Sequence, residues 1–276
     1  MSRLKARFDA LKAENRAAFV TYIQAGDPSR EVSSAILAGL PGAGADIIEL
    51  GMPFTDPAAD GPAIDKAAQR ALAAGASTKQ TFEMVREFRR TDDATPIVLM
   101  GYFNPVFHYG IDTFCKDAAT AGVDGLIVVD LPPEEDAELL APANANNIDV
   151  IRLATPTSDD HRLRTIVSGA SGFVYYVAVA GVTGGKSATA DDIGEAVARI
   201  KGHTDLPVAV GFGIKTPEQA ADVAARADAA VVGSAIVSLI EQGLENQQPN
   251  ADMIENILNF TQSLANGVRS GRNNGA

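Results

Sequence analysis

Eight short apolar segments alternate along the chain with longer segments of helical periodicity. Most of the apolar segments are continuous rather than alternating, which is typical of parallel strands covered on both faces. The predicted strands are residues 18–25, 46–50, 97–101, 125–129, 149–153, 173–178, 208–210 and 229–232. The predicted helices between them are residues 30–38, 78–90, 111–121, 133–144, 161–168, 191–200, 217–227 and 252–265. The predicted helix N-caps are Ser29, Ser77, Ser158 and Thr216, and Pro217 suits a first helical position.

This order predicts an α/β fold, a (β/α)8 TIM barrel in a single domain. The 276 residues are enough, because such a barrel typically needs about 250. An open doubly wound sheet is the alternative, but the first turn, at residues 24–28, lacks the G-x-G-x-x-G pattern that such sheets often carry. An extra N-terminal helix over residues 4–15 is expected to cover the barrel bottom. We expect the domain to span residues 1–268 and residues 269–276 to form a disordered tail.

Two carboxylates stand close together at the end of the second predicted strand. Glu49 ends the apolar run, and Asp60 lies in the Gly- and Pro-rich loop that follows. Barrel enzymes keep their chemistry at the C-terminal ends of strands. Burial would raise the pKa of Glu49 toward neutrality, whereas Asp60 in a wetter loop would stay ionised, which is a general acid/base pattern. The alternatives are a structural glutamate bonded to backbone N–H groups and a turn aspartate.

Charge and cysteine content exclude several classes of protein. The formal net charge of −12 argues against a nucleic-acid or anionic-membrane surface. Cys115 is the only cysteine, so no internal disulfide is possible, and its helical setting suggests a small buried hydrophobe. The three histidines, His108, His161 and His203, are scattered, so we predict no metal site.

The N-terminus lacks an apolar segment and no apolar run approaches about 18 residues, so we expect a cytoplasmic protein.

Three glycine-rich loops follow the sixth, seventh and eighth predicted strands, at residues 180–185, 211–214 and 233–235. Glycine lets backbone N–H groups approach an anion, and Ser234 opens a helical pattern whose N-terminus would carry a positive dipole end. Barrel enzymes often bind phosphate in the loops after strands seven and eight. The loops therefore predict a phosphate site, although glycine in α/β loops also serves turn geometry alone.

Six segments together resemble the tryptophan synthase alpha subunit family. They are residues 49–62, 100–105, 122–132, 181–184, 211–214 and 233–237, and they follow the family's order. The resemblance implies a lyase of tryptophan biosynthesis that cleaves indole-3-glycerol phosphate to indole and glyceraldehyde 3-phosphate without a cofactor. Glu49 resembles the general acid/base that protonates indole C3 and then deprotonates the glyceryl hydroxyl. Asp60 resembles the residue that accepts the indole N–H.

The resemblance also implies the residues that hold the substrate. Those predicted to bind its indole and glyceryl parts are Tyr22, Met100, Tyr102, Leu126, Tyr175, Thr183 and Phe212. Those predicted to bind its phosphate are Gly184, Gly213, Gly233 and Ser234. Two departures from the family stand out: residues 178–180 lack an arginine found in some members, and Tyr22 replaces a common phenylalanine.

The family implies a partner as well. The beta subunit, which carries pyridoxal phosphate, receives indole through a tunnel within an α2β2 complex. The proline-stiffened loops at residues 52–57 and 130–133, with Pro53, Asp56 and Pro132, would face it, because stiff loops lose little entropy on docking. Three other functions remain possible: a stand-alone lyase that releases indole, a catalytically silent phosphate sensor or scaffold, and an unrelated phosphate-binding isomerase barrel.

Overall fold

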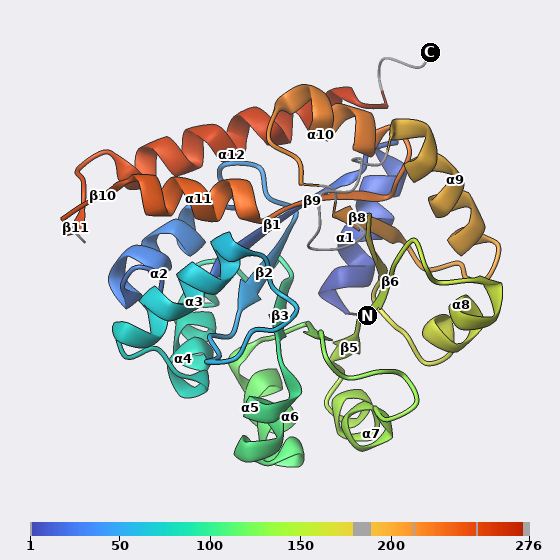
Figure 1. Ribbon diagram of the computed structural model, residues 1–276, viewed down its shortest axis with the longest axis horizontal. Helices are drawn as coiled ribbons and strands as arrows, with labels where there is room; N and C mark the ends of the chain where they lie inside the picture. Colours follow the sequence, from blue (N-terminus) through green and yellow to red (C-terminus); the bar gives the residue numbers. More distant parts are fainter. Residues whose placement is uncertain (1, 179–188, 212, 247, 273–276) are drawn as a thin grey trace.

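The strands form one parallel sheet that curves into a barrel with helices around its outside (Figure 1). The computed structural model describes residues 2–178, 189–211, 213–246 and 248–272. The sheet order is β5-β4-β3-β2-β1-β9-β8-β7-β6. Its strands are β1 (Ala18–Gln24), β2 (Ile47–Gly51), β3 (Ile97–Gly101), β4 (Gly125–Val128), β5 (Asp149–Val150), β6 (Arg152–Ala154), β7 (Val174–Val177), β8 (Val208–Gly211) and β9 (Ala229–Val232).

The barrel closes through one divided strand. The two edge strands, β5 and β6, are separated only by Ile151. The N–H of Ile151 donates to the carbonyl of Leu126 in the neighbouring strand β4. The predicted strand 149–153 is thus one strand with a single interruption, and each of the eight predicted strands is present. The predicted (β/α)8 barrel is confirmed.

The helices surround this barrel and connect its strands. They are α1 (Arg3–Ala13), α2 (Arg30–Gly39), α3 (Pro62–Ala73), α4 (Thr78–Phe88), α5 (Phe103–Tyr109), α6 (Ile111–Ala121), α7 (Ala137–Ala145), α8 (Asp160–Val167), α9 (Ala190–Lys201), α10 (Pro217–Ala224), α11 (Ser234–Gln242) and α12 (Met253–Ser270). A short antiparallel pair, β10 (Leu244–Glu245) and β11 (Gln248–Pro249), lies between the last two helices.

Each predicted helix is present, with local differences. Helices α3 and α5 were not predicted, and α7 begins later than expected because residues 133–136 form a turn. Ser158 is not a helix N-cap: Asp159 caps α8, and the Ser158 hydroxyl accepts from the Thr155 N–H instead. Helix α12 extends to Ser270, into the range expected to be a tail, and residues 273–276 lie outside the described part.

Alternate residues of each strand face the barrel interior. The interior cluster includes Val20, Ile47, Val98 and Ile127, and α1 closes its lower end with buried Leu4, Phe8 and Leu11. The Phe8 and Phe173 rings lie 5.9 Å apart, between α1 and the start of β7. The N-terminal helix therefore covers the barrel bottom as predicted, and the opposite end, where the strands terminate, remains open for a site.

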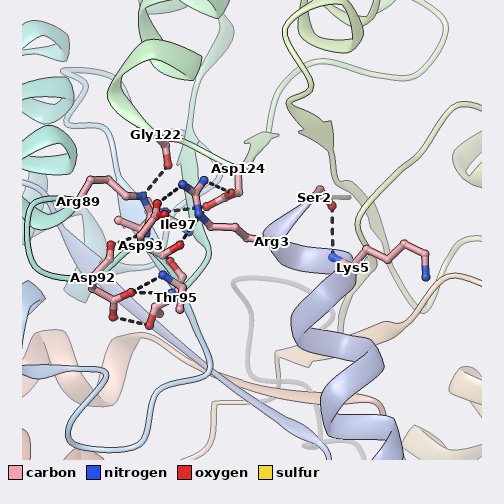
Figure 2. A network of polar contacts seen from close by, with 11 residues as sticks. Ser2, Arg3, Lys5, Arg89, Asp92, Asp93, Thr95, Ile97, Gly122 and Asp124 are labelled. Carbon is pink, nitrogen blue, oxygen red and sulfur yellow. Dashed lines mark hydrogen bonds and ion pairs between the residues drawn. The ribbon is translucent and has the colours of Figure 1, made fainter.

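An ion network joins α1 to the lower ends of two strands (Figure 2). Buried Asp124 accepts from Arg3 at 3.0 Å, from Arg89 at 2.7 Å and from the Ile97 N–H at 2.8 Å. Arg3 also donates to Asp93. Because both oxygens of Asp124 are used, this carboxylate fixes α1 against the entry to β3 and β4. The network lies at the end of the barrel away from Glu49 and serves the scaffold.

Candidate active site

A cavity of about 430 Å³ opens at the C-terminal ends of the strands. Its wall includes Tyr22 on β1, Glu49 on β2, Met100 on β3 and Tyr175 on β7, and Asp60 lies in the loop above β2. A larger cavity of about 880 Å³ lies beside α1 at the opposite end of the barrel. Much of the charge on that wall is paired internally, as in Lys5–Asp9 and Lys201–Asp228, and it contains none of the predicted site residues. The upper cavity is therefore the candidate active site.

Strand alternation brings Glu49 into this cavity. Ile47 belongs to the interior cluster, whereas Ile48 and Leu50 pack outward against the helices. Glu49 is 1% exposed, and its Oε1 has no hydrogen-bond partner among the described residues. Burial raises the pKa of this carboxyl to about 8. An acid with such a pKa is mostly protonated at neutral pH and can both donate and accept a proton there.

Asp60 occupies a different environment. It lies in the loop before α3, only partly buried, beside the Tyr102 hydroxyl. Burial raises the pKa of Asp60 to about 6, and the hydrogen bond from Tyr102 opposes that rise. The same hydroxyl accepts from the Ala59 N–H at 3.0 Å, which fixes the loop beside the carboxyl. At neutral pH Asp60 is thus mainly ionised while Glu49 is mainly protonated, which is the arrangement of an acid with an electrostatic partner.

Aromatic and sulfur-containing side chains form the apolar walls. Tyr22 lies opposite Glu49 in the register of β1 with β2, and Met100 and Tyr175 line the same cavity. The Phe54 ring lies 5.4 Å from that of Tyr102, beside Asp60. Burial raises the pKa values of Tyr22 and Tyr175 well above the usual range, so both hydroxyls remain neutral. These surfaces suit a flat, largely apolar ring.

Leu126 is not in the cavity wall. It belongs to the layer between the barrel and the helices, together with Leu99 and Ile48. Because strand side chains alternate, the residue of β4 that faces the interior is its neighbour Ile127. The predicted place of Leu126 in the cavity wall was therefore wrong, because neighbouring residues of a strand lie on opposite faces of the sheet.

Three of the four predicted phosphate residues line the cavity. Gly213, Gly233 and Ser234 line it, and Gly213 has a φ of 68°, a backbone conformation that favours glycine. Helix α11 begins at Ser234, and its N-cap, Gly233, makes no side-chain capping hydrogen bond. Its first N–H groups are therefore available to an anion, and the helix dipole favours negative charge there. Thr183, Gly184 and Phe212 lie outside the described residues.

The loops predicted to meet a partner lie at the same end of the barrel. Pro53 is half-buried, whereas Asp56 and Pro132 are exposed. The Phe103 N–H donates to the Asp130 carboxylate at 2.8 Å, so the start of α5 is joined to the second of these loops. On α5, the large apolar side chain of Phe107 is 61% exposed.

Sequence reasoning missed several residues of this region. Gln24 and Ile64 line the cavity or its inner extension, and Phe107 was not singled out. A glutamine at the end of the apolar strand Ala18–Gln24 was a usable signal. Ile64 required the prediction of α3.

No group of three or more His, Cys, Asp or Glu side chains within the described residues is arranged to hold a metal ion. None of the helices in the same residues combines the length and apolarity that a membrane span requires.

Comparisons with known proteins agree with the resemblance found in the sequence. Residues 8–269 match the family model described as tryptophan synthase alpha chain. The structure of tryptophan synthase subunit alpha from Legionella pneumophila is 37% identical, with a TM-score of 0.88 and 99% of each chain covered. A tryptophan synthase structure from Mycobacterium tuberculosis is 38% identical, with a TM-score of 0.87, covering 97% of this chain and 98% of that one. Another from M. tuberculosis, an aminoacrylate-bound form, is 36% identical with a TM-score of 0.86, covering 98% and 100%.

Proposed function

Because this chain belongs to the tryptophan synthase alpha chain family, we propose that it cleaves indole-3-glycerol phosphate to indole and glyceraldehyde 3-phosphate. The chain would act as a lyase in tryptophan biosynthesis. One observation above all supports this reaction: Glu49 is a buried carboxyl in the wall of the upper cavity, and one of its oxygens has no hydrogen-bond partner among the described residues. Such a group is a proton donor at neutral pH, and a carbon leaving group needs one.

The cavity offers a place for each part of the substrate. The uncapped start of α11 at Gly233 and Ser234 would hold the phosphate. The indole ring would lie among Tyr22, Met100 and Tyr102, with its N–H directed to Asp60. Glu49 would then face the carbon–carbon bond between the two ends, and Tyr175 would pack beside it. Gly184, Thr183 and Phe212 are proposed to complete this surface, as the family resemblance implies.

The proposed reaction is a retro-aldol step with one group moving the proton. Glu49 gives its proton to indole C3, which forms the indolenine and places positive charge on the ring nitrogen. The Asp60 carboxylate stabilises that charge through the N–H. The Glu49 carboxylate then removes the proton of the glyceryl hydroxyl next to the ring, the carbon–carbon bond breaks, and its electron pair restores the indole ring. Glu49 ends protonated, so the cycle balances without a cofactor in this chain.

We further propose that indole passes to a tryptophan synthase beta subunit in an α2β2 complex, in the cytoplasm. The beta subunit would carry pyridoxal phosphate. The loops with Pro53, Asp56 and Pro132 and the exposed ring of Phe107 lie at the cavity end of the barrel. An exposed aromatic side chain is a typical anchor of a protein interface.

A substitution at the start of α11 tests the phosphate end. Ser234→Asp is expected to raise KM for indole-3-glycerol phosphate about ten-fold or more and to change kcat little. Two unit charges about 4 Å apart in partly wet surroundings repel by roughly 1–4 kcal/mol. Steady-state kinetics would measure the change, with Ser234→Ala and the exposed helix residue Asn256→Asp as controls for lost hydroxyl and added charge. An unchanged KM in Ser234→Asp would place the phosphate elsewhere.

The proposed function is tested by mixing purified protein with indole-3-glycerol phosphate and measuring indole, with and without a beta subunit. We expect indole in both cases, and more rapid turnover when the beta subunit binds. Indole release that is indifferent to the beta subunit, with no complex in a pull-down, would favour the stand-alone lyase. No indole under either condition would refute the proposed reaction.

A further inference from the structure

A small recess extends the active-site cavity behind Asp60. It has a volume of about 10 Å³ and is lined by side chains that include Tyr22, Gln24, Phe54, Asp60 and Tyr102. Three residues, Tyr22, Asp60 and Met100, line both the recess and the main cavity, so the two are adjacent. A space of this size holds at most about one water molecule. The aromatic end of the cavity is therefore almost closed.

Gln24 is the polar side chain that closes this recess from β1. It is 2% exposed, and its Oε1 accepts from the Tyr22 hydroxyl at 2.7 Å. Its Nε2 donates to the Gly51 carbonyl at 2.8 Å. Two buried hydrogen bonds in opposite directions fix the amide, and through it the Tyr22 hydroxyl.

The neighbouring strand makes room for this pair. A Cβ at Gly51 would lie 2.1 Å from the Tyr22 hydroxyl oxygen and 2.7 Å from Gln24 Oε1. Glycine at the end of β2 thus permits the amide and the hydroxyl to occupy that space. The Gly51 carbonyl also accepts from the Ala25 N–H at 3.0 Å, so it would keep one partner if the Gln24 amide were removed.

We propose that Gln24 is a specificity-determining residue that limits how far an aromatic substrate ring enters the pocket. This inference rests on the proposed function. With the phosphate at α11 and the ring N–H at Asp60, the carbocyclic edge of the indole points to the recess. The Gln24 side chain fills the space behind that edge; its volume sets the limit on the ring, and its bond to Tyr22 only orients the amide. The unsubstituted ring fits, whereas a ring that carries an additional methyl group meets the fixed amide.

The test compares selectivity rather than rate alone. Wild type and Gln24→Ala would be assayed with indole-3-glycerol phosphate and with its four analogues methylated on the carbocyclic ring. We expect wild type to discriminate at least about ten-fold in kcat/KM against one or more analogues, as one extra methylene in a closed pocket commonly does. In Gln24→Ala this ratio should fall about ten-fold, because the recess opens.

Three further variants serve as controls for side-chain volume, for folding and for the substitution itself. Gln24→Met fills a similar volume without the hydrogen bonds, and it should keep the wild-type ratio within about three-fold. Gln24→Ser shortens the side chain again and serves if the alanine variant does not fold, which circular dichroism and thermal unfolding would reveal. Gln262→Ala makes the same substitution on the exposed face of α12 and should change nothing.

The outcomes separate this inference from the proposed function. Absence of indole release from the unsubstituted substrate by wild type would refute the function itself. Release without discrimination among the analogues would refute only the role of Gln24. The same conclusion would follow if the shortened variants kept the wild-type ratio, or if Gln24→Met relaxed it as far as alanine does.

Discussion

Glu49→Gln is expected to lower kcat for indole release by at least about 100-fold while leaving substrate affinity nearly unchanged. Glutamine has almost the same shape but cannot transfer a proton, and general acid/base catalysis at one position contributes roughly 10²–10⁴-fold. Steady-state kinetics would give kcat, and binding of the non-cleavable analogue 3-indolylpropyl phosphate would report affinity. Glu255→Gln, on the exposed side of α12, is the matched control. A variant that kept more than about a tenth of the wild-type rate would remove Glu49 as the proton carrier.

The same variant has a second readout in stability. The pKa of Glu49 is raised from 4.5 to about 8 by burial, so the folded protein binds more protons than the unfolded chain between these values. The free energy of unfolding of the wild type therefore falls as pH rises from about 4.5 to 8. At pH 7 this loss of stability amounts to roughly 3 kcal/mol. Denaturant unfolding at several pH values would measure it. Glu49→Gln should lack this part of the pH dependence.

Asp60→Asn is expected to lower kcat about 10- to 100-fold at pH 7.5. The asparagine carbonyl can still accept the indole N–H, but the negative charge that stabilises the indolenine is lost. Asp205→Asn, an exposed residue at the lower end of the barrel, removes a charge without touching the upper cavity and should leave the rate unchanged. An Asp60→Asn enzyme with the wild-type rate would show that this carboxylate has no part in catalysis.

The roles of Asp60 and Glu49 also predict how kcat/KM changes with pH. The pKa of Asp60 is about 6 and that of Glu49 about 8, and the reaction needs the first ionised and the second protonated. The wild-type kcat/KM should therefore fall below about pH 6 and again above about pH 8, with apparent values that belong to the free enzyme. In Asp60→Asn the acidic limb should disappear while the basic limb remains. Persistence of the acidic limb would assign it to another group.

The barrel could be predicted because its strands are buried on both faces. Continuous apolar runs such as the one before Glu49 need no knowledge of register to be recognised. Helix α3 was not predicted although Pro62 suits a first helical position; its buried face consists of the small residues Ala67, Ala68 and Ala71. Helix α5 was missed because it is short and contains Pro105. Both helices matter to the site, since α3 supplies Ile64 and α5 carries Phe107.

The site itself could be predicted only in part. The loop pattern after β2 identified Glu49 and Asp60 as candidates, but the pKa of each depends on burial and hydrogen-bond partners that no sequence motif specifies. Leu126 was placed on the wrong face of the sheet. The resemblance identified the segment around β4, but it did not determine which residue of that segment faces the interior. The role of Gln24 depends on contacts with Tyr22 and with the Gly51 carbonyl, and the second of these crosses from β1 to β2. Such contacts become visible only when the strand register is known.

Direct titration of the Glu49 carboxyl tests the central claim, which is that burial keeps this group protonated at neutral pH and so able to supply a proton. The side-chain carboxyl carbons of glutamate would be labelled with ¹³C, and NMR spectra of wild type and Glu49→Gln would be compared between pH 4 and 9. The resonance that is missing in the variant should titrate with a midpoint near 8. A midpoint near 4.5, the value from which burial raises this pKa, would contradict the account, because Glu49 would then hold no proton to give.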